Sequence, residues 1–250
     1  MANKKDERQS KIYHILLDEG CVSVKELAQR LLVTPETIRS DLTNMEDQRR
    51  VIREHGFARP LSTLEEVPVQ MREQENLDDK RRAAMRAMEE IEDNQTVFLD
   101  SGSTILLGLP ALSFKNVTIV TNGIPLAYEA GLLGYPVIFC GGQVSNVGLR
   151  THGHFCIDVI DRIQFDVALM GTDGLVGADS FTALAFNEIS IKEHIMAHSK
   201  KNIVVGDRSK FEKKAAYNIG KFRDVDVFVT NPLNEQERKM IREVKKVIEV

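Results

Sequence analysis

The sequence lacks long apolar runs, clustered cysteines and a strong excess of either charge. Its 250 residues contain no stretch of 18 or more apolar residues, so no transmembrane helix is expected. The charged N-terminus, MANKKDERQSK, has no apolar core of the kind found in a secretory signal. The three cysteines, Cys21, Cys140 and Cys156, are widely spaced without metal-site spacing, which favours a reducing, cytoplasmic setting.

The net charge of −4 is spread unevenly along the chain. Residues 1–60 hold 11 Lys and Arg against 10 Asp and Glu, whereas residues 61–250 hold 22 against 27. The first segment is therefore not a polybasic tail. If it binds nucleic acid, it must do so through individually placed cations and not through bulk charge.

Apolar residues at helical spacing predict three short helices in the first sixty residues. The first covers residues 6–19. Ser23 and Glu26 have the spacing of a capping box at the start of the second helix. Thr34 followed by Pro35 predicts an N-cap and a first helical residue for the third, because proline lacks the N–H that would be unsatisfied there.

The last two of these helices, joined by a tight turn, have helix-turn-helix spacing. In that motif the N-terminal residues of the second helix approach base edges in the major groove, and its start can meet a phosphate. Residues 51–60 predict a two-stranded wing with a turn at His55–Gly56. Three amphipathic helices also occur in proteins that bind no DNA, so the pattern alone leaves both interpretations open. The predicted DNA-binding residues are Ser23, Thr34, Pro35, Glu36, Thr37, Arg39, Ser40, Arg53, His55 and Arg59.

From Thr96 onward, short apolar runs alternate with helical stretches. The runs are TVFLD, VTIVTN, VIFCGG, DVALMGTDG, NIVVGD and DVFVTN. Continuous apolar strands of this kind predict a doubly wound, mostly parallel α/β sheet that is covered on both faces. The polar residues 61–76 are expected to form a linker. The predicted organisation is a winged helix-turn-helix domain over 1–60, a candidate for DNA binding, then a linker over 61–76 and an α/β domain over 77–250 that is a candidate for ligand binding.

The residues that follow the apolar runs are candidates for a ligand site, because ligands of parallel sheets bind beyond the carboxyl ends of the strands. Asp100–Thr104 has the composition of a phosphate cradle at a helix N-terminus, although ordinary capping turns use the same residues. Glu188 and Lys192 could likewise be an ordinary surface pair at i, i+4 spacing. The candidate ligand-binding residues are Asp100, Ser101, Gly102, Ser103, Thr104, Thr121, Asn122, Gly141, Gly142, Gly171, Asp173, Glu188, Lys192, Asp207 and Lys210.

Nearly the whole chain resembles the DeoR family of bacterial transcriptional regulators. The resemblance in the first domain rests on Glu7-Arg8, on SVKELAQRLLVTPETIRSDL from residue 23, and on IREHG from residue 52. In the second domain DSGST, TN, GG, GTDG, NEISIK and DRSKF follow in the family's order over 97–231. The chain departs from the family pattern at Ser40, where a second arginine is usual, and at Phe57, where a second glycine is usual.

The resemblance implies an α/β protein with a small winged helix-turn-helix and a larger sensor domain similar in fold to ribose-5-phosphate isomerase. It implies a regulator of a sugar or sugar-alcohol operon, most simply a repressor, although an activator is not distinguished. The expected partners are double-stranded operator DNA, a phosphorylated sugar or sugar alcohol, and further copies of the chain in a homo-oligomer, a dimer or tetramer. The resemblance implies that the candidate ligand-binding residues bind the effector. Ser101–Thr104 would hold its phosphate, and its polyol part would be surrounded by Asp173, Glu188, Lys192, Asp207 and Lys210. No cofactor, metal or membrane is expected.

The main alternative is a sugar-phosphate isomerase-like enzyme with an appended interaction domain. Such an enzyme needs an acid/base pair and a cation for the developing enediolate oxygen. No Lys or Arg occurs between Arg162 and Lys192, so we expect binding without turnover. Two histidine pairs, at 152 and 154 and at 194 and 198, have no clear third metal ligand nearby.

Overall fold

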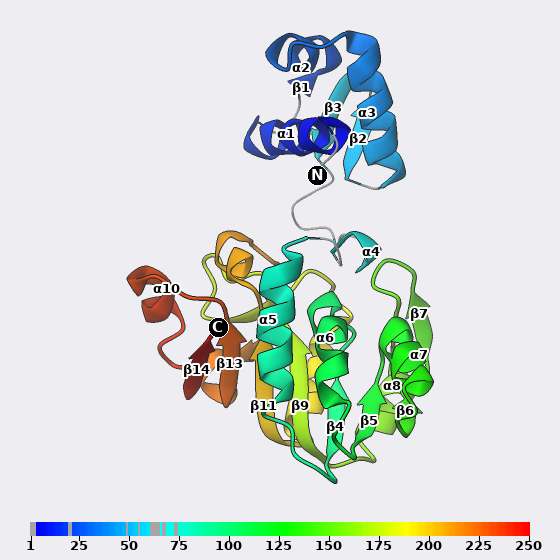
Figure 1. Ribbon diagram of the computed structural model, residues 1–250, viewed down its shortest axis with the longest axis vertical. Coiled ribbons are helices and arrows are strands. Elements are labelled where there is room, and N and C mark those ends of the chain that lie inside the picture. The colour runs from blue at the N-terminus through cyan, green and yellow to red at the C-terminus, as the bar shows by residue number, and fades with distance from the viewer. Residues whose placement is uncertain are drawn as a thin grey trace. The chain divides into compact units, whose positions relative to one another are not determined.

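The computed structural model describes residues 4–19, 22–48, 50–54, 56–60, 66, 69–72 and 75–250. Contacts along the chain divide it into two compact units, Met1–Val67 and Pro68–Val250 (Figure 1). The predicted α/β class is confirmed, because the first unit is largely helical and the second is built on a parallel sheet.

The first unit combines three helices with a small antiparallel sheet in the strand order β1-β3-β2. Its elements are α1 (Lys4–Glu19), β1 (Val22–Ser23), α2 (Val24–Arg30), α3 (Pro35–Asp47), β2 (Val51–Glu54) and β3 (Phe57–Pro60). The predicted wing is the β2–β3 hairpin, in which Ile52 pairs with Arg59. Strand β1 is an addition that the sequence did not predict, because two residues carry no detectable periodicity.

Helix α3 begins where the sequence predicted it. The Thr34 hydroxyl accepts a hydrogen bond from the Thr37 backbone N–H at 3.2 Å, and Pro35 occupies the first helical turn. Its inward face consists of Ile38, Leu42 and Met45, all fully buried.

A buried ion pair fixes α3 against α1. The Asp41 side chain is buried, and its carboxylate accepts hydrogen bonds from the Arg8 guanidinium, one of them 3.2 Å long. Asp41 is therefore a structural residue that pairs with an arginine.

The second unit contains, within the described residues, a seven-stranded parallel sheet in the order β14-β13-β11-β9-β4-β5-β6. The strands of this sheet are β4 (Thr96–Leu99), β5 (Thr118–Thr121), β6 (Val137–Phe139), β9 (Phe165–Gly171), β11 (Ser199–Val205), β13 (Val227–Thr230) and β14 (Lys246–Glu249). Two antiparallel pairs stand apart from it, β7 (Gln143–Ser145) with β8 (Arg150–His152) and β10 (Ser180–Ala183) with β12 (Tyr217–Lys221).

Helices and short 3-10 turns cover the sheet. The α-helices are α4 (Val69–Arg72), α5 (Leu77–Met88), α6 (Ser103–Gly108), α7 (Ile124–Leu132), α8 (His154–Ile160), α9 (Glu188–Ala197) and α10 (Glu235–Met240). The 3-10 turns are η1 (Leu109–Leu112), η2 (Arg208–Glu212) and η3 (Phe222–Asp224). Figure 1 shows α5 and α6 crossing the same face of the sheet.

Successive residues of the central strands enter two separate cores, one on each face of the sheet. On β4, Val97 and Leu99 pack with α5 and α6, whereas Phe98 packs with residues of α8 and α9. Because both faces are buried, the strands read as continuous apolar runs. The predicted sheet and its double covering are confirmed.

Helix α4 lies in the second unit, although the sequence suggested a linker over 61–76. Val69 is buried, and its backbone N–H donates to the Val147 carbonyl at 3.0 Å. The Asn76 amide donates to Asp207 at 3.3 Å. The division between the units falls at residues 67 and 68 because these contacts tie the end of the polar segment to the sheet domain.

Candidate functional site

The exposed side of α3 carries the residues that the sequence assigned to DNA. Glu36, Arg39 and Ser40 are exposed, and Arg39 forms an ion pair with Glu36 at 2.7 Å, three residues earlier. Thr34 is exposed beside them at the N-terminus of the helix, where backbone N–H groups favour a phosphate oxygen. Exposed polar and charged side chains and an exposed helix N-terminus are the features expected of a recognition helix.

The wing contributes Arg53 and Arg59 on paired strands. Arg53 donates to the Thr43 hydroxyl at 2.6 Å, so it links the wing to α3. Thr43, which the sequence analysis did not assign, is exposed on α3 and lies one helical turn after Arg39. Ser23 caps α2 by accepting from the Glu26 N–H at 3.2 Å, while His55 lies outside the described residues.

A small cavity opens at the carboxyl ends of strands β4 and β9. Its volume is about 30 Å³. The lining residues are Arg72, Asp100, Ser101, Gly102, Ser103, Thr104, Arg150, Gly171, Thr172, Asp173, Glu188, Lys192 and Lys210. Ten of the fifteen predicted effector-binding residues are among them, so strand ends far apart in the sequence do meet at one edge of the sheet.

Buried ion pairs organise this cavity around Lys192. Its ammonium lies 2.7 Å from Asp100 and 3.1 Å from Glu188, and it donates to the Gly171 carbonyl at 3.0 Å. Glu188 also pairs with Arg150 at 2.8 Å. Glu188 and Lys192 are therefore part of a buried network, and the alternative of an ordinary surface pair is excluded.

The buried network shifts the pKa values of Asp100, Lys192 and Glu188. Burial disfavours ionisation of Asp100, but Lys192 and hydrogen bonds from Gly171 and Ser101 outweigh it and lower the Asp100 pKa. Burial opposes the charge of Lys192 as well, yet Asp100 and Glu188 raise its pKa above the ordinary lysine value. Burial raises the pKa of Glu188 despite the adjacent cations, so this carboxyl binds a proton more readily than an exposed glutamate.

Two arginines that the sequence did not assign complete the cavity. Arg150 is 2% exposed and reaches Glu188 from β8, and Arg72 reaches Asp173 from α4 at 3.4 Å. Among the described lining residues, four cations therefore face three carboxylates. The stretch between residues 162 and 192 supplies no cation to the cavity, as its composition predicted, whereas Arg72 and Arg150 enter from α4 and β8, outside that stretch.

Five predicted effector residues are not among those that line the cavity. Thr121 and Asn122 are buried, and Asn122 donates to the Thr151 carbonyl at 3.0 Å, which holds β8 and thereby Arg150. Gly142 has φ +126°, and a Cβ there would lie 2.5 Å from the His152 carbonyl oxygen. Gly141 adjoins it, and Asp207 caps η2 by accepting from the Ser209 N–H at 3.0 Å. These residues shape the surroundings of the cavity.

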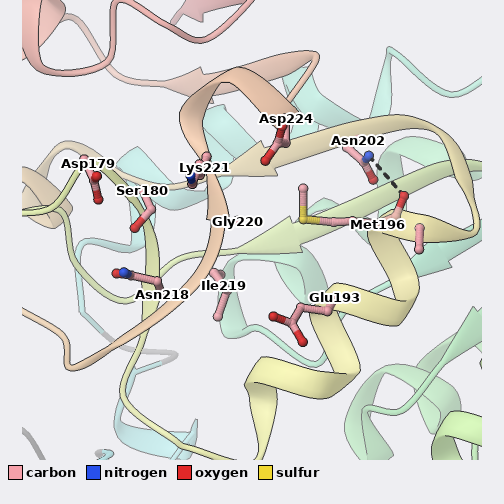
Figure 2. A pocket seen from close by; sticks show the side chains of 11 residues that line it. Asp179, Ser180, Glu193, Met196, Asn202, Asn218, Ile219, Gly220, Lys221 and Asp224 are labelled. Atoms are coloured by element: carbon pink, nitrogen blue, oxygen red, sulfur yellow. Dashed lines mark hydrogen bonds between the residues drawn. The ribbon is translucent and has the colours of Figure 1, made fainter.

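A second, larger hollow of about 530 Å³ lies between α9 and the β10–β12 pair. Figure 2 shows Asp179, Glu193 and Asp224 around it with Lys221, so carboxylates outnumber cations among the residues that line it. This balance disfavours an anionic ligand. The smaller cavity, with its excess of cations and the start of α6, remains the candidate effector site.

Comparison with known protein families decides the class of the chain. Residues 8–63 match the DeoR-like helix-turn-helix domain, and residues 75–232 match the DeoR C terminal sensor domain. This chain belongs to the DeoR family. It is a transcriptional regulator with a DNA-binding helix-turn-helix, and not an enzyme.

Relatives of this DeoR-type regulator align over most of their length. The glycerol-3-phosphate regulon repressor of Escherichia coli strain K12 is 28% identical over 91% of both chains. The HTH-type transcriptional regulator GlpR of Haloferax volcanii is 30% identical over 90% of this chain and 89% of its own. The solved ribose 5-phosphate isomerase A of Methanocaldococcus jannaschii aligns over 54% of each chain with 17% identity and a TM-score of 0.41.

The described part of the regulator contains no helix that is both long and apolar enough to span a bilayer. Within the same residues, no group of three or more His, Cys, Asp or Glu side chains is placed to hold a metal ion.

Proposed function

We propose that this regulator is a repressor of a sugar or sugar-alcohol operon, and that a phosphorylated sugar or sugar alcohol in the small cavity releases it from operator DNA. The repressor role is supported by the relative whose name describes a glycerol-3-phosphate regulon repressor. That name also makes glycerol 3-phosphate the first effector to test.

The observation that carries the proposal is the composition of the cavity. Arg72, Arg150, Lys192 and Lys210 supply positive charge, and α6 starts at Ser103, where backbone N–H groups have no acceptor within the helix. Such a start favours a phosphate. The carboxylates of Asp173 and Glu188 are suitable acceptors for sugar hydroxyls.

We infer that effector binding rearranges the cavity. Its free volume is only about 30 Å³, so lining side chains are expected to move when a sugar phosphate binds.

The energetic requirement is reciprocal. An inducer must bind the DNA-free protein more tightly than the DNA-bound protein, typically by about 1–3 kcal/mol, and DNA then weakens inducer binding by the same factor. An effector that binds both states equally cannot induce, however tight its binding.

A gel shift with DNA from upstream of the neighbouring operon tests the proposal. The complex is titrated with glycerol 3-phosphate and a panel of phosphorylated sugars, and with glycerol and inorganic phosphate as controls. We expect a phosphorylated compound to dissociate the complex while both controls leave it intact. A complex that forms but resists the whole panel would contradict the effector proposal, and failure to bind any operator DNA would contradict the repressor proposal.

A further inference from the structure

The chain segment from α7 to β7 is unusually poor in charge for the surface of this protein. Residues 124–145, IPLAYEAGLLGYPVIFCGGQVS, contain Glu129 as their single charged residue, whereas 28% of the whole chain is charged. The segment includes β6, the terminal strand of the parallel sheet. A low charge content at an exposed position is typical of an interface core.

Large apolar side chains are exposed along this segment and on the adjacent helix α8. We call this set the edge patch. Its members and their exposed fractions are Tyr128 64%, Leu132 67%, Leu133 56%, Ile138 41%, Phe139 41% and Phe155 73%. Exposed apolar patches of several hundred Å² often mark interaction sites.

The patch wraps around the free side of β6. Tyr128 and Leu132 lie one helical turn apart on α7, which packs against β6. Phe155 lies on α8, whose Cys156 shares a core cluster with Cys140 at the end of β6. Figure 1 shows α7, β6 and α8 together at one side of the sheet. Helices from both faces of the sheet, each with exposed apolar side chains, therefore flank the same edge.

Strand β6 pairs with β5 on one side and is the last strand of the sheet on the other. Soluble proteins usually protect such an edge with charged residues, proline or a covering element, because an exposed apolar edge strand pairs with other chains. Strand β6 is short, and Pro136 directly precedes it, but its residues Val137, Ile138 and Phe139 carry no charge. Ile138 and Phe139 are each 41% exposed, so this edge is a candidate for contact with another chain.

We propose that the edge patch is the interface with a second copy of this chain, in which the two β6 strands pair antiparallel about a two-fold axis. Such an interface is isologous, so each copy contributes the same apolar patch and the lone Glu129 brings little repulsion. Antiparallel pairing centred on the middle residue of β6 places Ile138 opposite Ile138 of the second copy. The two sheets then join into one continuous sheet, with α7 and α8 of each copy beside the seam.

The area of the patch matches a stable dimer. At about 150–200 Å² for a large side chain, six side chains exposed to this extent offer roughly 600 Å² per copy, close to the ~800 Å² per partner of a standard interface. Neighbouring backbone and small residues supply the remainder. Helix-turn-helix regulators usually bind paired half-sites with two DNA-binding domains, and a two-fold dimer provides two such domains.

The first test compares the mass of full-length variants by sedimentation. We expect the wild-type protein to sediment at twice its 28.2 kDa chain mass or a higher multiple. The double variant Leu132→Glu, Phe155→Glu should fall to half the wild-type mass, because burying two carboxylates per copy opposes association. The matched control is Phe114→Glu, since Phe114 is 95% exposed outside the patch, and it should keep the wild-type mass. Circular dichroism establishes that each variant is folded.

The second test probes the seam itself. Ile138→Cys, after mild oxidation, should give a chain-doubled band on a non-reducing gel, whereas Phe114→Cys should not. A wild-type protein that is monomeric at micromolar concentration, or a double variant that is folded and retains the wild-type mass, would overturn the proposal. A dimer that the double variant disrupts but that Ile138→Cys never cross-links would overturn the antiparallel pairing of β6. Both measurements are made without DNA or effector, so their outcome is independent of the proposed function.

Discussion

Arg72 and Asp173 lie 101 residues apart in the sequence, yet the Arg72 Nη1 atom is 3.4 Å from the Asp173 Oδ1 atom. The contact joins α4, which follows the segment between the two units, to the turn at the end of β9. Burial alone would raise the Asp173 pKa, but Arg72, Lys210 and Lys192 lower it below the ordinary value. Asp173 is therefore ionised at neutral pH and attracts Arg72 toward the cavity.

Replacement of Arg72 should weaken effector binding and leave operator binding intact. Arg72→Met removes one of the cations that face the ligand, and loss of a hydrogen bond to a charged group costs about 1.5–3 kcal/mol, or roughly 10- to 150-fold in affinity. Titration calorimetry with glycerol 3-phosphate measures the change. The control Arg238→Met removes a surface arginine paired with Glu249 and should bind the effector normally. If Arg72→Met and Arg238→Met bind glycerol 3-phosphate with equal affinity, Arg72 does not contact the effector.

Lys192 should be important for stability as well as for binding. Lys192→Met leaves Asp100 and Glu188 buried without their shared cation, and breaking a buried ion pair in this way costs about 3–5 kcal/mol. Urea unfolding followed by near-ultraviolet circular dichroism measures the loss. Lys200→Met is the control, because Lys200 pairs with Asp166 at 2.8 Å with its own side chain 74% exposed. That control should lose less than about 1 kcal/mol, and similar losses in both variants would contradict the role of the buried network.

The sheet could be predicted from sequence because its signal is local. Each central strand is a short apolar run, and the polar residues that follow the run mark its carboxyl end. Because the carboxyl ends of parallel strands lie at one edge of the sheet, Asp100, Asp173 and Lys210 could be predicted to share a site. Arg150 could not be predicted, because it enters the cavity from a three-residue strand whose position depends on Asn122 and Thr151. Asn122 also follows a strand and was therefore predicted to bind the ligand. In the structure its amide instead donates to the carbonyl of Thr151 on β8, so it has a structural role.

The reading helix should depend on Arg39. Arg39→Ala should lower operator affinity by about 1–3 kcal/mol if the guanidinium contacts a base, and the slope of log affinity against log salt should change by about one unit if it contacts a phosphate. Arg82→Ala is a matched control, since Arg82 pairs with Asp79 three residues earlier on an exposed helix face of the second unit, as Arg39 does with Glu36. Fluorescence anisotropy with labelled operator measures both effects. If the Arg39→Ala protein keeps the wild-type affinity and salt slope, α3 is not the recognition helix.

Glu90 should make stability depend on pH in the acid range. Hydrogen bonds from Lys201 and Arg86 lower the Glu90 pKa to about 2, despite the opposing effect of burial. A carboxyl with a lowered folded-state pKa stabilises the protein fully above its unfolded value of about 4.3, and this contribution disappears as pH falls toward 2. Because solvent screens these surface pairs, we expect about 1 kcal/mol. Glu90→Gln should therefore lower the melting temperature at pH 7 and have little effect at pH 2.5. An equal loss at both pH values would show that charge is not the cause.

We propose that a phosphorylated ligand releases operator DNA by occupying the Lys192 cavity. The most direct measurement is operator dissociation by glycerol 3-phosphate, compared between the wild-type protein and Ser103→Leu, in which a bulky side chain fills the start of α6 at a buried lining position. We predict that both proteins bind operator with the same affinity and that only the wild-type protein is released. A Ser103→Leu protein that is released at the wild-type ligand concentration would contradict the account.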